Sequence, residues 1–162
     1  MLREIVTDAA LLGTGTLFGA SLYDAVVLAP NLRGGPAGLE HARLFLSRAT
    51  PANLFRVASP LAQALLLAAT VVNWGSPACR WPLAAAFVAL VLNDVITFKY
   101  HYPRNQLFFT APLTVDAARL DTAARQWAGM NYVRVALAFG AWLGCLVAVI
   151  RLAVEGRAWP FA

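Results

Sequence analysis

The chain has 162 residues, of which 60% are hydrophobic and only 13% are charged. Soluble domains carry roughly 25% charged residues, so this composition excludes an ordinary water-exposed surface and predicts an integral membrane protein. The length fits one domain. The formal net charge of +5 comes mainly from arginine. Because the arginines flank apolar segments and form no basic run, they indicate contacts with membrane lipid and not with nucleic acid.

Four segments are apolar and long enough to cross a bilayer as helices, since a span needs about 20 residues. They are expected at 9–29, 54–74, 81–98 and 127–152. Pro30 is expected to end the first helix, and the stretch from Tyr100 to Pro103 is expected to close the third. No alternating ten-residue pattern indicates a barrel. The predicted fold class is therefore an all-α integral membrane four-helix bundle, with 1–162 forming a single membrane domain.

The two long connections also carry helical sequence. Between the first and second spans, apolar residues from Leu39 to Leu46 alternate with charged ones such as Glu40. This pattern predicts a short amphipathic helix at the membrane surface. Before the fourth span, Thr114 is a candidate N-cap with Asp116 early in the first turn. That helix is expected to run directly into the fourth span.

With four spans, both termini lie on one side of the membrane and the long loops lie on the other. The long-loop side carries the larger number of arginines. The positive-inside rule then predicts an integral protein of a bacterial-type inner membrane, with the long loops in the cytoplasm and the termini opposite.

Small residues in the spans indicate close helix packing. Gly15 and Gly19 form one GxxxG pair, and Gly140 and Gly144 form another. Such pairs serve packing within one chain or between the chains of a homo-oligomer. Cys79 falls in a predicted turn and is interpreted as a small apolar residue.

Ionisable residues inside a bilayer are costly, so they usually face a partner or a cavity. Asp24 lies near the end of the first span, Asp94 late in the third, and Arg134 about two turns into the fourth. Connectivity places all three toward the long-loop side, where a buried Asp and Arg stabilise each other's charge. Two interpretations stay open: an ion pair that only fixes the bundle, and a polar pocket open to that side.

The start of the fourth span carries a further pattern. Trp127, Asn131 and Arg134 are spaced i, i+4 and i+7, which places them on one helical face. An indole stacks on flat rings, while an amide and a guanidinium bind oxygens and stabilise a developing oxyanion. The alternative for Trp127 is a place in the interfacial aromatic belt.

Two histidines, His41 and His101, are expected near the interface on the long-loop side. Each is a candidate general base, because the unperturbed imidazole titrates near neutrality. The alternative is a solvated interfacial side chain. No spacing typical of a metal site, such as HxxxH, is present, so the sequence predicts no metal and no cofactor.

Three stretches carry a family resemblance. They read GTGTLFGASLYDAVVLAP at 13–30, YHYPRNQLF at 100–108 and WAGMNYVR at 127–134. They resemble the first helix, the Pro-x-Asn segment and the W-x-x-x-N-x-x-R pattern of the DUF1772 family of small four-helix membrane proteins, which includes the anthrone oxygenases. The resemblance implies that fold. In the characterised branch it implies oxidation of polycyclic anthrones to anthraquinones by molecular oxygen, with no established need for a metal or flavin.

On this resemblance, the expected function is a membrane-embedded, cofactor-independent oxygenase acting on a polycyclic phenolic or related small apolar aromatic substrate. The expected catalytic residues are Asp24, Asp94, His101 and Arg134, and the expected substrate-binding residues are Tyr23, Asn105, Trp127 and Asn131. Two other interpretations stay open. One is a non-catalytic accessory subunit of a larger membrane complex, and the other is a small transporter or channel.

Overall fold

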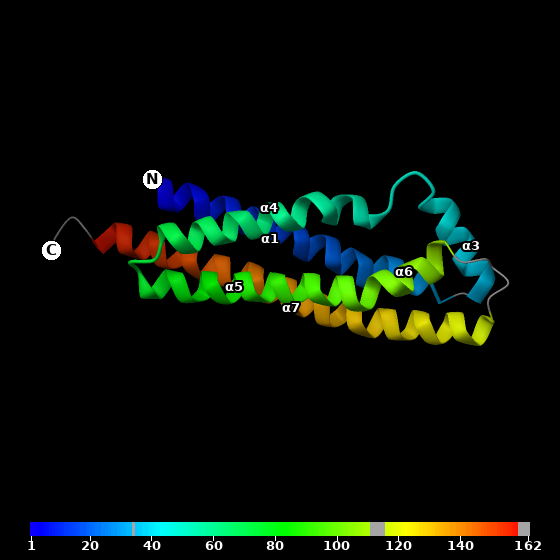
Figure 1. Ribbon diagram of the computed structural model, residues 1–162. Coiled ribbons are helices and arrows are strands. Elements are labelled where there is room, and N and C mark those ends of the chain that lie inside the picture. Colours follow the sequence, from blue (N-terminus) through cyan, green and yellow to red (C-terminus); the bar gives the residue numbers. More distant parts are fainter. Residues whose placement is uncertain (34, 111–115, 159–162) are drawn as a thin grey trace.

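The computed structural model describes residues 1–33, 35–110 and 116–158, and it shows an elongated bundle of helices (Figure 1). In chain order the elements are α1 (Leu2–Tyr23), the π-helical turn η1 (Asp24–Leu28), α2 (Ala29–Asn31), α3 (Gly35–Phe45), α4 (Pro51–Val72), α5 (Pro77–Ile96), the π-helical turn η2 (Thr97–His101), α6 (Tyr102–Phe109) and α7 (Ala117–Ala158). The fold class predicted from the sequence is confirmed.

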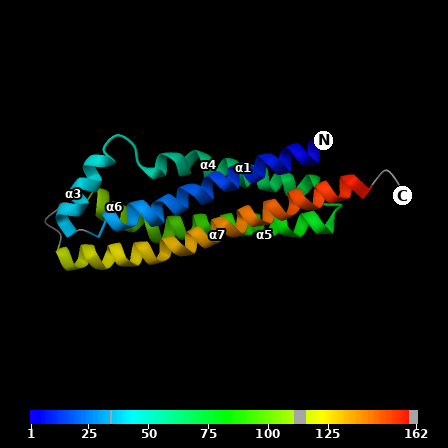
Figure 2. The same cartoon turned by 180° about the vertical axis from the view of Figure 1, so that it is seen from behind.

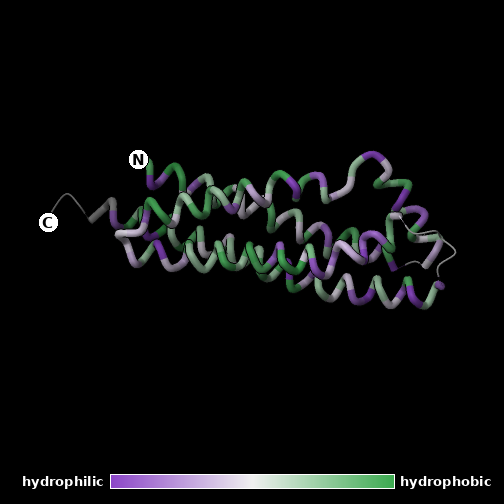
Figure 3. Tube along the Cα trace, in the orientation of Figure 1, coloured by the Kyte–Doolittle hydropathy of each residue, from purple (hydrophilic) through white to green (hydrophobic). Residues whose placement is uncertain are grey.

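Four stretches of the described chain are long and apolar enough to cross a membrane. They are Leu2–Asn31, Pro51–Val72, Pro77–Phe109 and Ala117–Glu155. Helix α1 packs against α4 and α7, and α5 packs against the same two helices, so the four helices form a ring. The start of α1 and the end of α7 lie at one end, and α3 lies at the other (Figures 1 and 2). Hydrophilic positions become frequent toward the end that carries α3 (Figure 3).

Two of the helices run on through prolines that were expected to end them. The first continues through η1 and α2 to Asn31, and the third continues through η2 and α6 to Phe109. A proline lacks the N–H that an α-helix needs and its ring crowds the carbonyl four residues back. At both Pro30 and Pro103 a π-helical turn directly precedes the short helix that contains the proline. The wider turn accommodates the ring, so the helix is locally widened and does not end.

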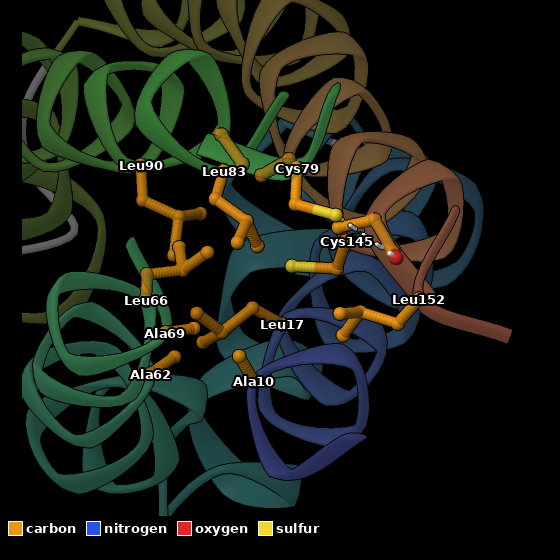
Figure 4. Packing of buried hydrophobic residues seen from close by; sticks show 13 residues of the cluster. Ala10, Leu17, Ala62, Leu66, Ala69, Cys79, Leu83, Leu90, Cys145 and Leu152 are labelled. Atoms are coloured by element: carbon orange, nitrogen blue, oxygen red, sulfur yellow. Dashed lines mark hydrogen bonds between the residues drawn. The ribbon is translucent and has the colours of Figure 1, made fainter. Parts of the chain in front are cut away.

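The half of the bundle near the termini has a core of small and branched apolar residues (Figure 4). Its fully buried members include Leu66, Leu83, Cys79 and Cys145. Cys79 lies in the first turn of α5 and not in the preceding turn as expected, because Pro77 already begins the helix. The Cys79 thiol lies 3.8 Å from the Ala148 carbonyl oxygen of α7.

One glycine of each GxxxG pair faces another helix of the same chain. A Cβ atom at Gly144 would lie 2.7 Å from the Pro82 carbonyl oxygen, so the backbones of α5 and α7 approach closely there. A Cβ at Gly15 would lie 3.3 Å from the Trp142 ring. Gly19 and Gly140 have nothing within 4 Å. Half of this small-residue pattern therefore serves packing within the chain.

At the opposite end, α3 is amphipathic, as the sequence predicts. Its Leu39 and Ala42 are buried in a second apolar cluster with residues of α6 and α7. Leu44 and Phe45 are 67% and 75% exposed. Asp116 was expected within the first turn, but it precedes α7, and its Oδ1 accepts a hydrogen bond from the Ala118 N–H as an N-cap side chain does. The N-cap candidate Thr114 lies outside the described residues.

Candidate functional site

A cavity of about 300 Å³ lies in the half of the bundle that carries the long loops. Its volume falls at the lower end of the roughly 300–1,000 Å³ that is typical of ligand pockets. Five of the residues expected to form a site line it, namely Asp24, His101, Asn105, Trp127 and Arg134. Apolar walls are added by Leu28, Phe55, Tyr102 and Phe109. Residues from η1, α4, η2, α6 and α7 thus meet around one space.

The two π-helical turns place two of the polar residues in this cavity. Asp24 is the first residue of η1, and His101 is the last residue of η2. A π-turn inserts one extra residue into a helix and so rotates the side chains that follow; such turns are frequent at functional sites. Each π-turn also lies shortly before a proline, Pro30 or Pro103.

Arg134 of α7 is held by groups from three helices and is 4% exposed. Its Nε donates to Asn93 Oδ1 of α5 at 3.1 Å, and its Nη1 donates to Asn131 Oδ1 at 3.0 Å. Nη1 also lies 3.8 Å from Asp24 Oδ2. The expected proximity of Asp24 and Arg134 is therefore observed. The guanidinium lies 5.0 Å from the centre of the Phe55 ring, a cation–π distance.

Three of the eight expected site residues do not line the cavity, and one of them, Asn131, lies beside it and binds Arg134. Asp94 does not line the cavity, and its carboxylate accepts hydrogen bonds from Ser59 Oγ at 2.9 and 2.8 Å and from Gln63 Nε2 at 2.7 Å. It is thus bound to neutral donors of α4 and makes no direct pair with Arg134. Tyr23 is 46% exposed and is also not among the lining residues.

His101 and Trp127 form one buried wall of the cavity. Their rings meet edge to face with centroids 5.1 Å apart. Trp127 Nε1 donates to Asn105 Oδ1 at 2.9 Å, which fixes the plane of the indole. The two residues are 1% and 2% exposed, so the alternatives of a solvated interfacial side chain for His101 and a belt position for Trp127 are wrong, whereas His41 is exposed. The third helix continues beyond Phe98 and brings His101 and Asn105 against the Trp127 ring.

Several buried polar atoms at this site have no hydrogen-bond partner among the described residues. They are Asp24 Oδ1, both ring nitrogens of His101, Asn131 Nδ2 and Ser21 Oγ. A buried polar atom without a partner costs about 1–3 kcal/mol, so native proteins keep few of them. Asp24 and His101 also line the cavity. We call the buried end of the cavity, formed by Asp24, His101 and Arg134, its floor. The floor therefore offers both donors and acceptors to a ligand that bears a hydroxyl or carbonyl group.

The contribution of α4 to the site was not anticipated from the sequence. Phe55 lines the cavity, while Ser59 and Gln63 hold Asp94. A signal was present, because these three residues are spaced four apart and two of them are polar residues inside an otherwise apolar helix. Residues at this spacing share one helical face. Asn93, which binds Arg134, likewise stands beside Asp94 in a long apolar segment.

In the part of the chain that the structure describes, no three His, Cys, Asp or Glu side chains are grouped so that they could hold a metal ion. No family model, no curated protein and no solved structure matches the chain. Function is therefore inferred from the chemistry of the site itself.

Proposed function

We propose that the protein is a membrane-embedded oxygenase that oxidises a planar, phenolic, anthrone-like substrate with molecular oxygen and without a cofactor. The observation that carries the proposal is the position of His101. Its two unpartnered ring nitrogens are buried at the same cavity as the Arg134 guanidinium. A free imidazole and a fixed cation beside one ligand space provide a base and an oxyanion-stabilising group.

The walls of the cavity suit a flat aromatic molecule. Trp127, Phe55 and Phe109 line it from α7, α4 and α6. Aromatic faces and edges attract other rings beyond the gain from burial alone. An anthrone between these side chains would place its carbonyl oxygen toward Arg134 and the methylene carbon, on the opposite side of its central ring, toward His101.

The chemistry needs only a proton acceptor, charge stabilisation and oxygen. His101 accepts a proton from the methylene carbon of the anthrone, and Arg134 stabilises the negative charge that moves to the ring oxygen. The electron-rich anion reduces O₂ and forms a C–O bond, and the resulting peroxide takes up a proton. Loss of the second methylene proton breaks the O–O bond. The methylene carbon is thereby oxidised to a carbonyl, with one oxygen atom retained and the other released as water.

The remaining polar residues position the guanidinium of Arg134 and the indole of Trp127. Asn93 and Asn131 fix the guanidinium of Arg134, and Asn105 fixes the indole of Trp127. Asp24 supplies the negative charge that makes a buried arginine tolerable. These residues are positioning residues, since they act through their neighbours.

The test is oxidation of anthrone by the purified protein in phosphatidylcholine nanodiscs, followed by absorbance with the uncatalysed rate subtracted. His101→Phe is expected to lower kcat by about 100-fold or more, the usual contribution of a general base. His41→Phe is the matched control, because His41 is an exposed histidine on α3. Full activity in His101→Phe, or in both Arg134→Ala and Asn131→Ala, would remove the proposal.

A second candidate is a non-catalytic subunit of a larger membrane complex. Gly19 and Gly140 have nothing within 4 Å, and small residues of this kind let another helix approach in lipid. The network around Arg134 would then serve only to fix the bundle. This candidate predicts no turnover with any planar substrate, together with co-purification of a partner that Gly140→Leu releases.

The orientation in the membrane follows from charge. We infer that the cavity end faces the cytoplasm in a bacterial-type inner membrane, because the long-loop end of the bundle carries more arginines than the end with the termini. A reporter that is active only outside the cytoplasm, fused after residue 162, is expected to be active. An inactive fusion would reverse the orientation.

A further inference from the structure

The mouth of the cavity differs in chemistry from its floor. The exposed lining residues are Arg56 of α4 and Gln106 and Thr110 at the end of α6. Arg56 has no hydrogen-bond or ion-pair partner in the described part of the chain, whereas Arg134 on the floor is paired with Asp24. The mouth therefore presents a positive charge that the protein itself does not neutralise.

The first turn of α4 adds to this positive potential. Thr50, Pro51 and Ala52 line the cavity, and they are the N-cap and the first two residues of a 22-residue helix. The amino end of a helix carries the positive end of its dipole and favours anions. The lining residues as a whole include two arginines and one aspartate, so the cavity matches a ligand with a negative charge.

The residues at the floor of the cavity give independent evidence that the cavity binds a ligand. Asp24 and His101 are 3% and 1% exposed. Both residues line the cavity, and each has at least one buried polar atom without a partner among the described residues. A ligand that satisfies the floor and also reaches the mouth must carry polar groups at both of its ends.

We propose that the substrate of this cavity carries an acidic group, such as a carboxylate, that binds Arg56 and the first turn of α4 at the mouth while its ring oxygen lies on the floor. The proposal rests on the proposed function, since it assumes that a planar substrate occupies the same cavity. It narrows the substrate class from neutral polycyclic phenols to aromatic acids.

The test compares two stable ligands of nearly equal size in phosphatidylcholine nanodiscs, by titration calorimetry. One is anthraquinone-2-carboxylate and the other is the neutral 2-(hydroxymethyl)anthraquinone. One exposed ion pair and one helix end together are worth about a five- to tenfold gain in affinity. The carboxylate is therefore expected to bind about that much more tightly to the wild-type protein.

Arg56→Gln removes the charge at the mouth and is expected to bring the two affinities to within about twofold of each other. Arg48→Gln is the matched control, because Arg48 is an exposed arginine that precedes α4 and does not line the cavity. It changes the net charge equally and is expected to retain the preference for the carboxylate.

Three outcomes overturn the proposal. If the wild type binds both ligands equally, the site exists but does not select an acid. If Arg48→Gln loses the preference as fully as Arg56→Gln, the attraction is a diffuse effect of charge. If phosphatidylglycerol in the nanodisc lowers the affinity for the carboxylate ligand but not for the neutral one, the mouth binds a lipid phosphate and not the substrate. Failure of both ligands to bind the wild type would instead refute the proposed function, on which this inference depends.

Discussion

The two halves of the bundle are built from the same four long helices but are packed differently. Near the termini, small and branched residues such as Ala86 and Leu83 fill the centre, and Gly144 brings two backbones together. Toward the long loops, the centre holds polar side chains, two π-helical turns and a cavity. Close packing of apolar side chains thus stabilises one half, whereas the other half is less closely packed around a polar cavity. The comparison suggests that the first half supplies the rigidity that the second half needs.

The largest effect is expected from Arg134→Ala. The substitution leaves Asp24 buried without its cation and leaves the side-chain oxygens of Asn93 and Asn131 without their donor. Breaking a buried pair by removing one partner costs about 3–5 kcal/mol. Arg151→Ala on the exposed face of α7 is the control. The stability of both variants is measured in detergent by titration with dodecyl sulfate, with unfolding followed by circular dichroism. Equal midpoints for the two variants would show that the polar half is not held together by this network.

A somewhat smaller loss is expected from Leu66→Ala in the apolar half. Leu66 is fully buried in the cluster of Figure 4, and its truncation leaves a void among α1, α4 and α5. Leucine truncations of this kind cost about 2–3 kcal/mol where the surroundings cannot collapse. Leu67→Ala, whose side chain is 52% exposed, is the matched control on the same helix. The same dodecyl sulfate titration compares the unfolding midpoints of the two variants. An unchanged midpoint for Leu66→Ala would contradict the view that this half is close-packed.

Gly144→Ala tests the closest approach of two helices in that half. The added methyl group would meet the Pro82 carbonyl oxygen of α5, so the backbone must shift. Overpacking of this kind costs about 1–2 kcal/mol. Gly140→Ala, one helical turn earlier and with open space around it, is expected to leave stability unchanged. A larger loss in Gly140→Ala than in Gly144→Ala would mean that the free face of α7 is the packed one.

The smallest effect on stability is expected from His101→Leu. Because neither ring nitrogen has a partner among the described residues, the substitution removes an uncompensated desolvation cost, and stability should stay the same or rise by about 1 kcal/mol. Oxidation of anthrone should nevertheless be lost. His41→Leu on the exposed surface of α3 is the control for both measurements. A loss of stability well beyond that of the control would show that His101 has a structural role.

The fold could be predicted from the sequence because long apolar segments allow only helices in a bilayer. The helix ends could not, since Pro30 and Pro103 are stop signals in isolation and become part of longer helices only when a π-helical turn relieves the clash. The nearness of Asp24 and Arg134 followed from connectivity alone. The pairing of Asp94 did not, because it depends on the rotation of α4, which no local pattern determines.

The residues around the cavity also could be predicted from the sequence only in part. Trp127, Asn131 and Arg134 were expected on one helical face, and all three are buried at or beside the cavity. Their partners Asn93 and Asn105 lie on the continuous third helix, and the extra residue in η2, between the two asparagines, changes which way Asn105 faces relative to Asn93. Spacing within one helix can be predicted from periodicity, whereas contacts between helices depend on their relative rotation and depth.

The length of α7 has a consequence for how the protein would meet its ligand. Its 42 residues extend about 63 Å at 1.5 Å per residue, roughly twice the hydrocarbon thickness of a bilayer. Part of the bundle must therefore stand outside the hydrocarbon layer, and if that part is the long-loop end, the cavity mouth lies close to the head groups. An amphipathic aromatic molecule is concentrated in that layer by partitioning and would reach the mouth by diffusion in two dimensions. Its apparent KM, expressed per volume of solution, should then rise in proportion to the amount of lipid added.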